Sequence, residues 1–391
     1  MTKEIYLFNP ENDMALANFT PYYKAPKEII RMANDLSVLP SWYAPEGSII
    51  KVNSLLQADL QKRQCPVPEL TPQVEWCDTW ENAPYRPWGW NPSLLHTLRQ
   101  SGVNENFLLS DEQIQRLRFL SGRQRCTEIL QSFTDSNLLC GEAMVCDTLS
   151  QIQNYVRNTG ECILKAPWSG SGRGLVHVSP TSWTSSIEGW AERILRVQGN
   201  IMAEPLYNKV KDFAMEFYSD EKGHTHFIGY SLFETDIHGN YKANILSSDK
   251  QIEQILSYYI PTATLHNTRQ TLETVLSDLI GTAYHGYLGV DMMICRASGN
   301  YNYQLHPCVE VNLRMNMGVV SHLIFERYVH PQAHGKYIVE YYATDGEALE
   351  VHQQYLYTHP LKLQDEKLAK GYFSLTPVEK STRYHIFLLL T

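Results

Sequence analysis

The sequence has no long apolar run, no basic stripe and no closely spaced cysteine pair. No stretch approaches the roughly 18 apolar residues of a membrane span, and the apolar run at the N-terminus is too short for a signal peptide, so no membrane partner is expected. The sequence has 33 Lys and Arg residues and 42 Asp and Glu residues, and it contains no run of basic residues. A nucleic-acid partner is therefore not expected. The eight cysteines include no C-x-x-C, which predicts buried thiols in a reducing cytoplasm rather than a zinc site or a disulfide framework.

The composition and the length of the sequence indicate a globular chain with more than one structural unit. Hydrophobic residues make up 43% and charged residues 19%, a composition typical of folded proteins. With 391 residues the chain is too long for one ordinary core, so two or three domains or lobes are expected. Residues 1–109 predict an α/β unit with strands near 4–8 and 48–52 and helices near 54–62 and 92–100. Residues 76–90 are rich in tryptophan and are predicted to form a packed loop. Their aromatic side chains are expected to pack against the protein rather than to bind a substrate.

A second unit begins at a strong helix start. Ser110 and Gln113 fit a capping box, and apolar residues follow at helical spacing. Beyond it the pattern predicts strand 162–165, a glycine loop, strand 176–178, helix 184–197, strand 201–204, antiparallel strands over 212–246, helix 268–284, a hairpin over 289–311 and helix 318–328. Residues 331–391 give weak signals, although the apolar run 386–390 favours a strand packed on the body.

The glycine loop after residue 165 is the first sign of chemistry. Its three alternate glycines can expose backbone N–H groups to an anion, two serines add hydroxyls, and the lysine adds a point charge. It lacks the Gly-Lys-Ser/Thr ending of a P-loop and the helix that follows a dinucleotide fingerprint. With these two motifs excluded, the segment is predicted to be a phosphate-binding loop that connects two strands and covers a nucleotide. The alternative is a flexible hairpin turn. The candidate contacts are Lys165, Ser169, Gly170, Ser171, Gly172, Arg173 and Gly174.

The acidic hairpin is the second sign. Glu310, Asn312 and Arg314 alternate along one strand and therefore share one face. Asp291 lies on the other arm of the predicted hairpin and can meet them across the pair. Magnesium prefers hard oxygen ligands, and Arg314 would act as a positive clamp on a phosphoryl group. The alternative is a surface ion pair between Glu310 and Arg314.

The two motifs, in this order, resemble the ATP-grasp superfamily over about residues 110–330. The resemblance implies an α/β N-terminal domain (1–109) followed by an α+β two-lobed ATP-grasp fold (110–330). The small lobe would cover about 140–205 and the large lobe about 206–330, with 331–391 as an extension packed on the body. It also implies MgATP held between the lobes, with Mn²⁺ as a substitute metal.

Residue by residue, the resemblance assigns the glycine loop and Lys165 to the nucleotide phosphates. Glu204 and Leu206 would read the adenine edge, and Asp212 would bind the ribose. Asp291, Glu310 and Asn312 would be metal ligands, with Arg314 near the transferring phosphate. The family's second nucleotide lysine is missing, since no lysine lies between Lys62 and Lys165. Arg116, Arg118 or Arg123 could replace it, with Arg123 as the choice, and the alternative for each is a solvated helix face.

The implied activity is an ATP-dependent ligase that joins a carboxylate to an amine or thiol through an acyl phosphate. A small-molecule kinase on the same fold and a non-catalytic ATP-binding regulator are the alternatives. The partners would be small-molecule carboxylates and amines, and a homo-oligomer is compatible with the sequence. Residues 9–13 after the first strand are expected either to contact substrate or to cap a helix.

Overall fold

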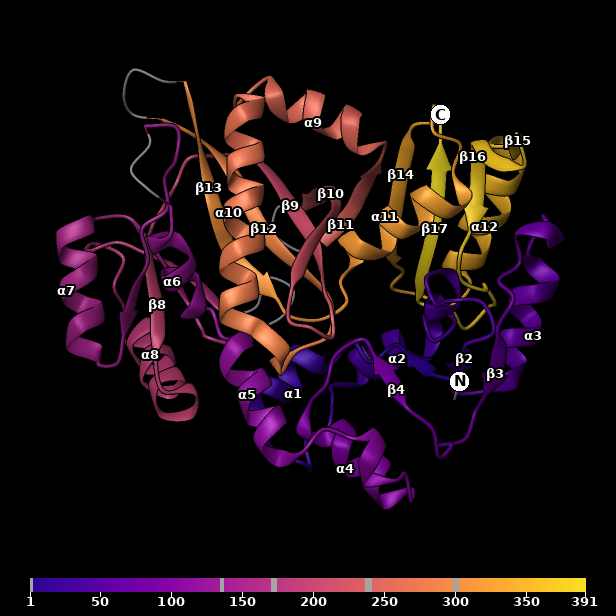
Figure 1. Cartoon of the computed structure of the whole chain (residues 1–391), viewed down its shortest axis with the longest axis horizontal. Coiled ribbons are helices and arrows are strands. Elements are labelled where there is room, and N and C mark those ends of the chain that lie inside the picture. Colours follow the sequence, from indigo (N-terminus) through magenta and orange to yellow (C-terminus); the bar gives the residue numbers. More distant parts are fainter. Residues whose placement is uncertain (1–2, 134–136, 170–173, 236–240, 298–301) are drawn as a thin grey trace.

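The computed structural model describes residues 3–133, 137–169, 174–235, 241–297 and 302–391, and these residues form three sheets (Figure 1). The first sheet is parallel, in the order β3-β2-β1-β4. Its strands are β1 (Ile5–Leu7), β2 (Ile49–Lys51), β3 (Glu75–Cys77) and β4 (Tyr85–Pro87). Its helices are α1 (Asn12–Asn18), α2 (Lys27–Asp35), α3 (Leu55–Gln64) and α4 (Pro92–Gln100), with 3₁₀ turns η1 (Leu39–Trp42), η2 (Pro68–Leu70) and η3 (Glu105–Phe107).

Local chemistry explains the helix starts but not every strand of this unit. Asn91 caps α4 by accepting a hydrogen bond from the Leu94 N–H, and Pro92 takes the first helical position, as predicted. The prediction of a packed loop over 76–90 is wrong in part, because β3 and β4 reach into it and pair with β2 and β1. β3 (Glu-Trp-Cys) and β4 (Tyr-Arg-Pro) lack the isoleucines that made the equally short β1 and β2 recognisable, so the sequence carried no strand signal for them.

The second sheet is small and antiparallel, in the order β5-β8-β6-β7. It comprises β5 (Met144–Cys146), β6 (Cys162–Lys165), β7 (Leu175–Val178) and β8 (Ile201–Pro205), with α7 (Leu149–Thr159) and α8 (Ser185–Gln198) packed on it. Thr148 and Thr184 cap the two helices, and α8 turns Ile187, Ala191 and Ile194 toward the sheet. The predicted strands and the helix are confirmed, whereas residues 170–173 of the predicted glycine loop lie outside the described residues.

The third sheet has nine strands, in the order β13-β12-β9-β10-β11-β14-β17-β16-β15. The strands are β9 (Lys209–Ser219), β10 (Thr225–Thr235), β11 (Tyr241–Leu246), β12 (Gly286–Arg296), β13 (Tyr303–Asn312), β14 (Gly335–Tyr341), β15 (Lys362–Gln364), β16 (Lys367–Ser374) and β17 (Tyr384–Leu390). The helices in this part of the chain are α9 (Asp249–Ser257), α10 (Thr262–Ile280), α11 (Met317–Tyr328) and α12 (Glu347–Thr358), with the 3₁₀ turn η4 (Gly281–Ala283). The predicted hairpin and antiparallel run are confirmed, and the weakly patterned tail supplies four of the nine strands.

Two helices and two shared cores join the parallel sheet to the large one. Helices α5 (Asp111–Ser121), which starts at the predicted Ser110 capping box, and α6 (Arg125–Gln131) connect the N-terminal unit to the rest. One core runs from β1 and α4 through α5 into β9 and β12. A second joins Phe8 and Trp42 to Phe373 and Ile386, and the Trp42 indole N–H donates to the Leu375 carbonyl at 2.6 Å. Figure 1 shows the parallel sheet below the large sheet and the small sheet to one side.

The cysteines differ in burial. All eight are free thiols, and the five buried ones are Cys126, Cys146, Cys162, Cys295 and Cys308. Of the helices that the described residues form, none combines the length and apolar character that crossing a bilayer requires.

Candidate functional site

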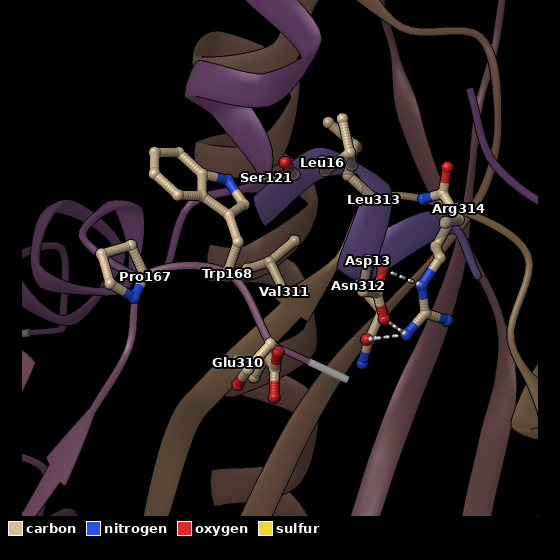
Figure 2. Close-up of a pocket in the computed structure, with 12 residues that line it drawn as sticks. Asp13, Leu16, Ser121, Pro167, Trp168, Glu310, Val311, Asn312, Leu313 and Arg314 are labelled. Carbon is tan, nitrogen blue, oxygen red and sulfur yellow. Dashed lines mark hydrogen bonds and ion pairs between the residues drawn. The ribbon is translucent and has the colours of Figure 1, made fainter. Parts of the chain in front are cut away.

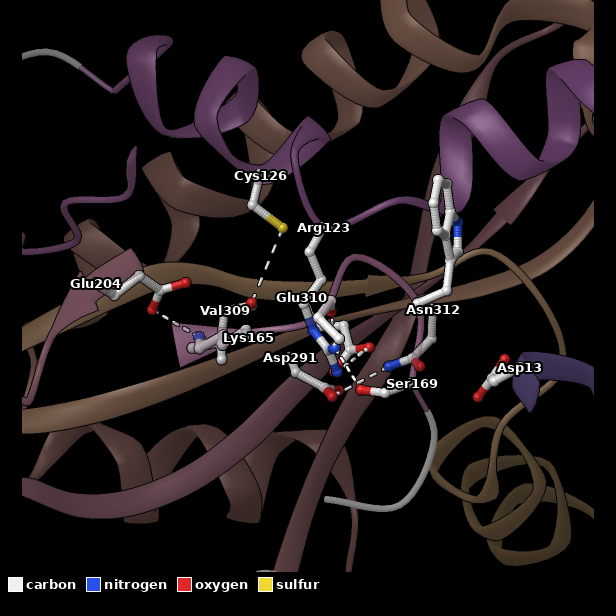
Figure 3. A network of polar contacts seen from close by, with 12 residues as sticks. Asp13, Arg123, Cys126, Lys165, Ser169, Glu204, Asp291, Val309, Glu310 and Asn312 are labelled. Carbon is white, nitrogen blue, oxygen red and sulfur yellow. Dashed lines mark hydrogen bonds and ion pairs between the residues drawn. The ribbon is translucent and has the colours of Figure 1, made fainter. Parts of the chain in front are cut away.

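Lys165 and Glu204 form a buried ion pair on the small sheet. Their strands β6 and β8 are neighbours, with Ile163 opposite Glu204. The Lys165 Nζ donates to a Glu204 carboxylate oxygen at 2.6 Å, and the two side chains are 5% and 4% exposed (Figure 3). The structure thus brings together the residues predicted to contact the nucleotide from this sheet. Leu206 is different, because its N–H already donates to the Glu161 carbonyl at 2.9 Å.

The glycine loop joins β6 to β7 as a hairpin. Residues Gly170, Ser171, Gly172 and Arg173 lie outside the described residues. The hairpin is closed by a hydrogen bond of 2.9 Å from the Ala166 N–H to the Gly174 carbonyl. Gly174 has φ +76°, and a Cβ there would stand 2.8 Å from the Ser169 Cβ. Only glycine fits this turn, which folds the chain back closely over Ser169.

Arg123 connects the glycine loop to the acidic hairpin. It lies between α5 and α6 with 6% of its side chain exposed. One terminal nitrogen donates to the Ala166 carbonyl at 2.7 Å and to the Ser169 hydroxyl at 2.6 Å. The other donates to both Glu310 oxygens at 2.7 Å (Figure 3). Burial opposes the charge of the guanidinium, but the Glu310 carboxylate outweighs it and raises the pKa of Arg123.

Asp291 and Glu310 face each other across the β12–β13 pair. The strand register places them directly opposite, and Asn312 donates to Asp291 at 3.1 Å from the neighbouring position. Burial, and then the charge of Glu310, raise the pKa of Asp291 to about 7. Asp212 on β9 lies near enough to raise the pKa of Asp291 further, while its own carboxylate pairs with Lys209. The two carboxylates repel each other, and a bound cation would remove that repulsion.

These residues fit magnesium better than a transition metal. Among the described residues, no group of three or more His, Cys, Asp or Glu side chains is placed to hold a metal ion. Magnesium needs fewer protein ligands, because it binds through one or two carboxylates and completes its shell with phosphate oxygens and water. Asp291 and Glu310 supply that set, with Asn312 beside them. The Glu310 oxygens have lone pairs beyond those that Arg123 engages.

Arg314 is held by a residue of the N-terminal unit. Its Nε and one terminal nitrogen donate to the two Asp13 oxygens at 2.7 and 2.6 Å, and the same terminal nitrogen donates to Asn312 at 3.0 Å (Figure 2). The Asp13 charge raises the pKa of Arg314 despite its burial. Asp13 lies in the first turn of α1, whose N-cap is Glu11, so it does not act as the helix cap. The pair spans 301 positions, and no pattern in the sequence links its two members.

A pocket forms where these segments meet. It is lined by Asn12 and Asp13 of α1, by Pro167, Trp168 and Ser169 before the glycine loop, and by residues 310–314 (Figure 2). Arg118 connects two residues that line the pocket, Trp168 and Leu16. Its guanidinium lies 4.2 Å from the Trp168 ring and donates to the Leu16 carbonyl at 3.0 Å. The N-terminal unit, the small sheet and the large sheet therefore all contribute to one site.

Glu216 is a buried carboxyl group that the sequence analysis missed. It lies on β9, is 1% exposed, and accepts a hydrogen bond of 2.9 Å from Asn316. A Cβ on Gly289 or Gly318 would stand 2.4 or 2.1 Å from its oxygens, so both glycines make room for it. Burial raises the pKa of Glu216 to about 8. The one signal available was an acidic residue inside the otherwise apolar run 213–217.

Glu216→Gln should flatten the dependence of stability on pH. The folded chain keeps the Glu216 proton up to about pH 8, whereas the unfolded chain releases it near the ordinary value of 4.5. The folded state therefore binds more protons across this window, and stability falls as pH rises from about 4.5 to 8, by roughly 4 kcal/mol at most. Glutamine mimics the neutral acid without titrating. Thermal unfolding at pH 5 and pH 8 should show a smaller difference in the variant, and an equal difference would contradict the assignment.

Comparisons with known proteins establish the fold. No protein-family model and no curated protein sequence matches the chain. A solved biotin carboxylase from Campylobacter jejuni matches at 10% identity over 100% of this chain and 88% of that one, with a TM-score of 0.51. Pyruvate carboxylase from Rhizobium etli matches at 11% identity over 99% of this chain and 35% of that one, with a TM-score of 0.50. N5-carboxyaminoimidazole synthetase from Staphylococcus aureus matches at 11% identity over 100% and 93%, with a TM-score of 0.49.

Biotin carboxylase is an ATP-grasp enzyme, and the fold of this chain is the ATP-grasp fold. The prediction of an α/β N-terminal domain followed by an α+β two-lobed ATP-grasp fold is confirmed. The residue boundaries of the units and the roles of the individual site residues stay predictions.

Proposed function

We propose that the chain is an ATP-dependent ligase that binds MgATP between the small and large sheets and joins a carboxylate to an amine. The observation that carries the proposal is that two arginines meet the Asp291–Glu310 carboxylate pair, Arg123 by donating to Glu310 and Arg314 through Asn312, which donates to Asp291. The Lys165–Glu204 ion pair lies on the small sheet, next to the Ala166 carbonyl that Arg123 also contacts. Cations next to paired carboxylates are what a magnesium–phosphate complex requires. The same arrangement has no evident use in a structural protein, because buried charges are costly without a ligand.

Each group has a distinct task in this proposal. Lys165 and the N–H groups of the glycine loop hold the nucleotide phosphates, and Glu204 orients Lys165 through its ion pair. Asp291, Glu310 and Asn312 would hold Mg²⁺, which neutralises phosphate charge when bound. Arg123 fixes Ser169 and Glu310 relative to each other, so the loop and the metal ligands keep one geometry. Arg314, held by Asp13 and Asn312, would stabilise the negative charge on the transferring phosphoryl group.

The chemistry needs positioning and charge rather than a nucleophile from the protein. A carboxylate oxygen of the substrate attacks the γ-phosphorus, the bond to the β-phosphate oxygen breaks, and ADP leaves. The amine then attacks the carbonyl carbon of the acyl phosphate, phosphate leaves, and the amine loses a proton. The pocket lined by residues 310–314, Trp168 and Asp13 is where these two substrates would meet.

The comparisons support the nucleotide part of the proposal. The structure of the Campylobacter jejuni biotin carboxylase is a complex with β-γ-ATP, and its fold spans this entire chain. Small-molecule carboxylates and amines remain the proposed partners, in a cytoplasmic setting that the cysteine content favours. Mn²⁺ should replace Mg²⁺ because it accepts the same oxygen ligands.

The experiment is an ATP-turnover assay with pooled substrates. The protein is incubated with MgATP and pooled carboxylic acids, with and without pooled amines, and both ADP and free phosphate are measured. We expect phosphate release that requires both pools, and the same requirement with Mn²⁺. ADP without free phosphate would show a kinase instead, and tight MgATP binding without any ADP from either pool would show a nucleotide-binding regulator.

A further inference from the structure

Arg118 lies where the N-terminal unit meets the small sheet. It belongs to the last turn of α5 and is half-buried between two aromatic rings. Its guanidinium lies 4.3 Å from the centre of the Phe19 ring and 4.2 Å from the centre of the Trp168 ring. Phe19 follows α1, and Trp168 follows β6. A planar guanidinium stacks favourably on aromatic faces, so Arg118 connects two segments that are distant in the sequence.

Arg118 also makes hydrogen bonds with both segments. Its Nε donates to the Leu16 carbonyl at 3.0 Å, and one terminal nitrogen donates to the Ala17 carbonyl at 3.4 Å. These carbonyls lie in the last turn of α1, where a helix leaves carbonyl groups without partners and favours a positive charge. The backbone carbonyl of Arg118 in turn accepts a hydrogen bond of 3.0 Å from the Trp168 indole N–H. The contacts therefore fix both the end of α1 and the Trp168 side chain.

The charge of Arg118 is not engaged by an acid. Arg123 and Arg314 each bind a carboxylate, whereas no Asp or Glu in the described part of the chain forms an ion pair with Arg118. Burial lowers the pKa of its guanidinium, and no neighbouring charge opposes that effect. An ion pair is therefore not the reason for an arginine at this position. The planar shape and the directed N–H groups account for it instead.

Phe19 adopts a backbone conformation that is unfavourable for phenylalanine. Its φ of +52° lies in the left-handed region, and a helix end of this kind usually carries glycine or asparagine. Residues persist in such conformations where the surrounding contacts hold them. The Phe19 ring makes two contacts of this kind, one with Arg118 and one with the core that joins the N-terminal unit to the large sheet.

The segment that Arg118 reaches leads from β6 into the glycine loop. This segment comprises residues 166–169, and Arg123 donates to the Ser169 hydroxyl at 2.6 Å. Arg118 holds the preceding residue, Trp168, by the ring stack and by the indole hydrogen bond. Trp168 also lines the pocket beside the acidic hairpin (Figure 2). Two arginines from the α5–α6 region thus hold two neighbouring residues of one segment.

We propose that Arg118 is a positioning residue for the nucleotide site, which fixes residues 166–169 against α1, the helix that holds Arg314 through Asp13. The effect on the nucleotide rests on the proposed function, whereas the anchoring of the two segments does not. Phosphates that bind at residues 166–169 would meet a segment whose position is already set, and this lowers the cost of ordering it on binding. Because α1 also carries Asp13, the same residue keeps Arg314 in register with that segment.

The first test is amide hydrogen exchange of the full chain without nucleotide. In Arg118→Met, residues 12–19 and 166–169 should both exchange at least tenfold faster than in wild type, because both lose the stack and the hydrogen bonds that hold them. Arg269→Met is the matched control, since Arg269 is a half-buried arginine 5.2 Å from the Phe227 ring and lies outside the pocket. The control should leave both segments unchanged. A wild-type rate in either segment of Arg118→Met would overturn the proposal.

The second test is calorimetric titration of a non-hydrolysable ATP analogue with Mg²⁺. Arg118→Met and Trp168→Leu should each raise the Kd at least tenfold, and the double variant should stay within about threefold of the weaker single variant, because the two residues act as one unit. A purely structural role would instead give effects that add. Additive effects, or a Kd for Arg118→Met within threefold of wild type, would contradict the proposal. Thermal unfolding checks folding, and Arg118→Lys, which keeps the charge but lacks the planar stacking surface, replaces Arg118→Met if that variant does not fold.

The two tests separate a failure of this proposal from a failure of the proposed function. If wild type does not bind MgATP but exchange is faster in Arg118→Met, the proposed ligase is wrong and the anchoring by Arg118 stands. If wild type and Arg118→Met bind MgATP equally well, the nucleotide site stands and the role of Arg118 is refuted.

Discussion

Glu310→Gln is expected to lower ATP turnover about a thousandfold, because removing one charged group that acts on the transferring phosphate costs two to three orders of magnitude. Glutamine keeps the shape of the side chain but removes the negative charge that Arg123 contacts and that the proposed metal would use. The measurement is kcat for phosphate release at saturating MgATP. Turnover within tenfold of wild type would show that Glu310 is not a metal ligand.

The same change should also lower stability, which separates Glu310 from an ordinary surface acid. Arg123 is 6% exposed, and in this variant it loses the carboxylate that it contacts and hydrogen-bonds only to neutral acceptors, such as the Ala166 carbonyl and the Ser169 hydroxyl. Leaving a buried charge unpaired costs up to about 3–5 kcal/mol, and less here because the Glu310 side chain is 27% exposed. The double variant Arg123→Gln/Glu310→Gln should recover stability without recovering turnover. Glu234→Gln, which breaks the exposed pair with Lys336, is the control and should change neither.

Asp13→Asn is expected to lower kcat by one to two orders of magnitude while leaving the Kd for MgATP within about threefold of wild type. Asp13 holds two nitrogens of Arg314 but lies outside the proposed nucleotide and metal contacts. Asparagine can satisfy one of these donors and removes the counter-charge, so the guanidinium would lose its fixed orientation. Because Asp13 acts through Arg314, it is a positioning residue.

The readout that distinguishes positioning from a structural role is the separation of kcat from MgATP affinity. A purely structural role would lower both together with the thermal midpoint. Asp59→Asn on the exposed side of α3 is the matched control and should leave all three quantities unchanged. If Asp13→Asn retains the full kcat, then Arg314 either does not need Asp13 or does not act on the phosphate.

The parts of the site that the sequence predicted are those with a local pattern. Lys165 and Gly174 flank a loop whose glycine spacing is unusual, and the structure closes that loop as a hairpin. Asp291 and Glu310 lie on the two arms of one predicted hairpin, so predicting that they lie opposite each other required only the correct strand register. Arg123 was a candidate because the second nucleotide lysine of the ATP-grasp superfamily is missing from this sequence. The structure places Arg123 between Ser169 and Glu310.

The parts that could not be predicted depend on tertiary contacts. Asp13 meets Arg314 only because the N-terminal unit packs under the large sheet, and a single sequence carries no trace of that packing. Glu216 interrupts an apolar strand by one residue, and its role depends on Gly289 and Gly318, which come from other elements. The position of β17 within the sheet could not be predicted from the sequence either. An interior strand is covered on both faces, so its apolar run does not alternate.

The position of β17 has a consequence for the synthesis of the chain. It follows all other strands in sequence, yet it pairs with β14 on one side and β16 on the other. The nine-stranded sheet therefore cannot be completed until residues 384–390 have left the ribosome. Phe8 and Trp42 share their core with Phe373 and Ile386, so a nascent chain shorter than this keeps an N-terminal apolar surface uncovered. The apolar surface at Phe8 and Trp42 therefore stays uncovered until the strand at residues 384–390 has been synthesised, and until then it is exposed to aggregation and to chaperones.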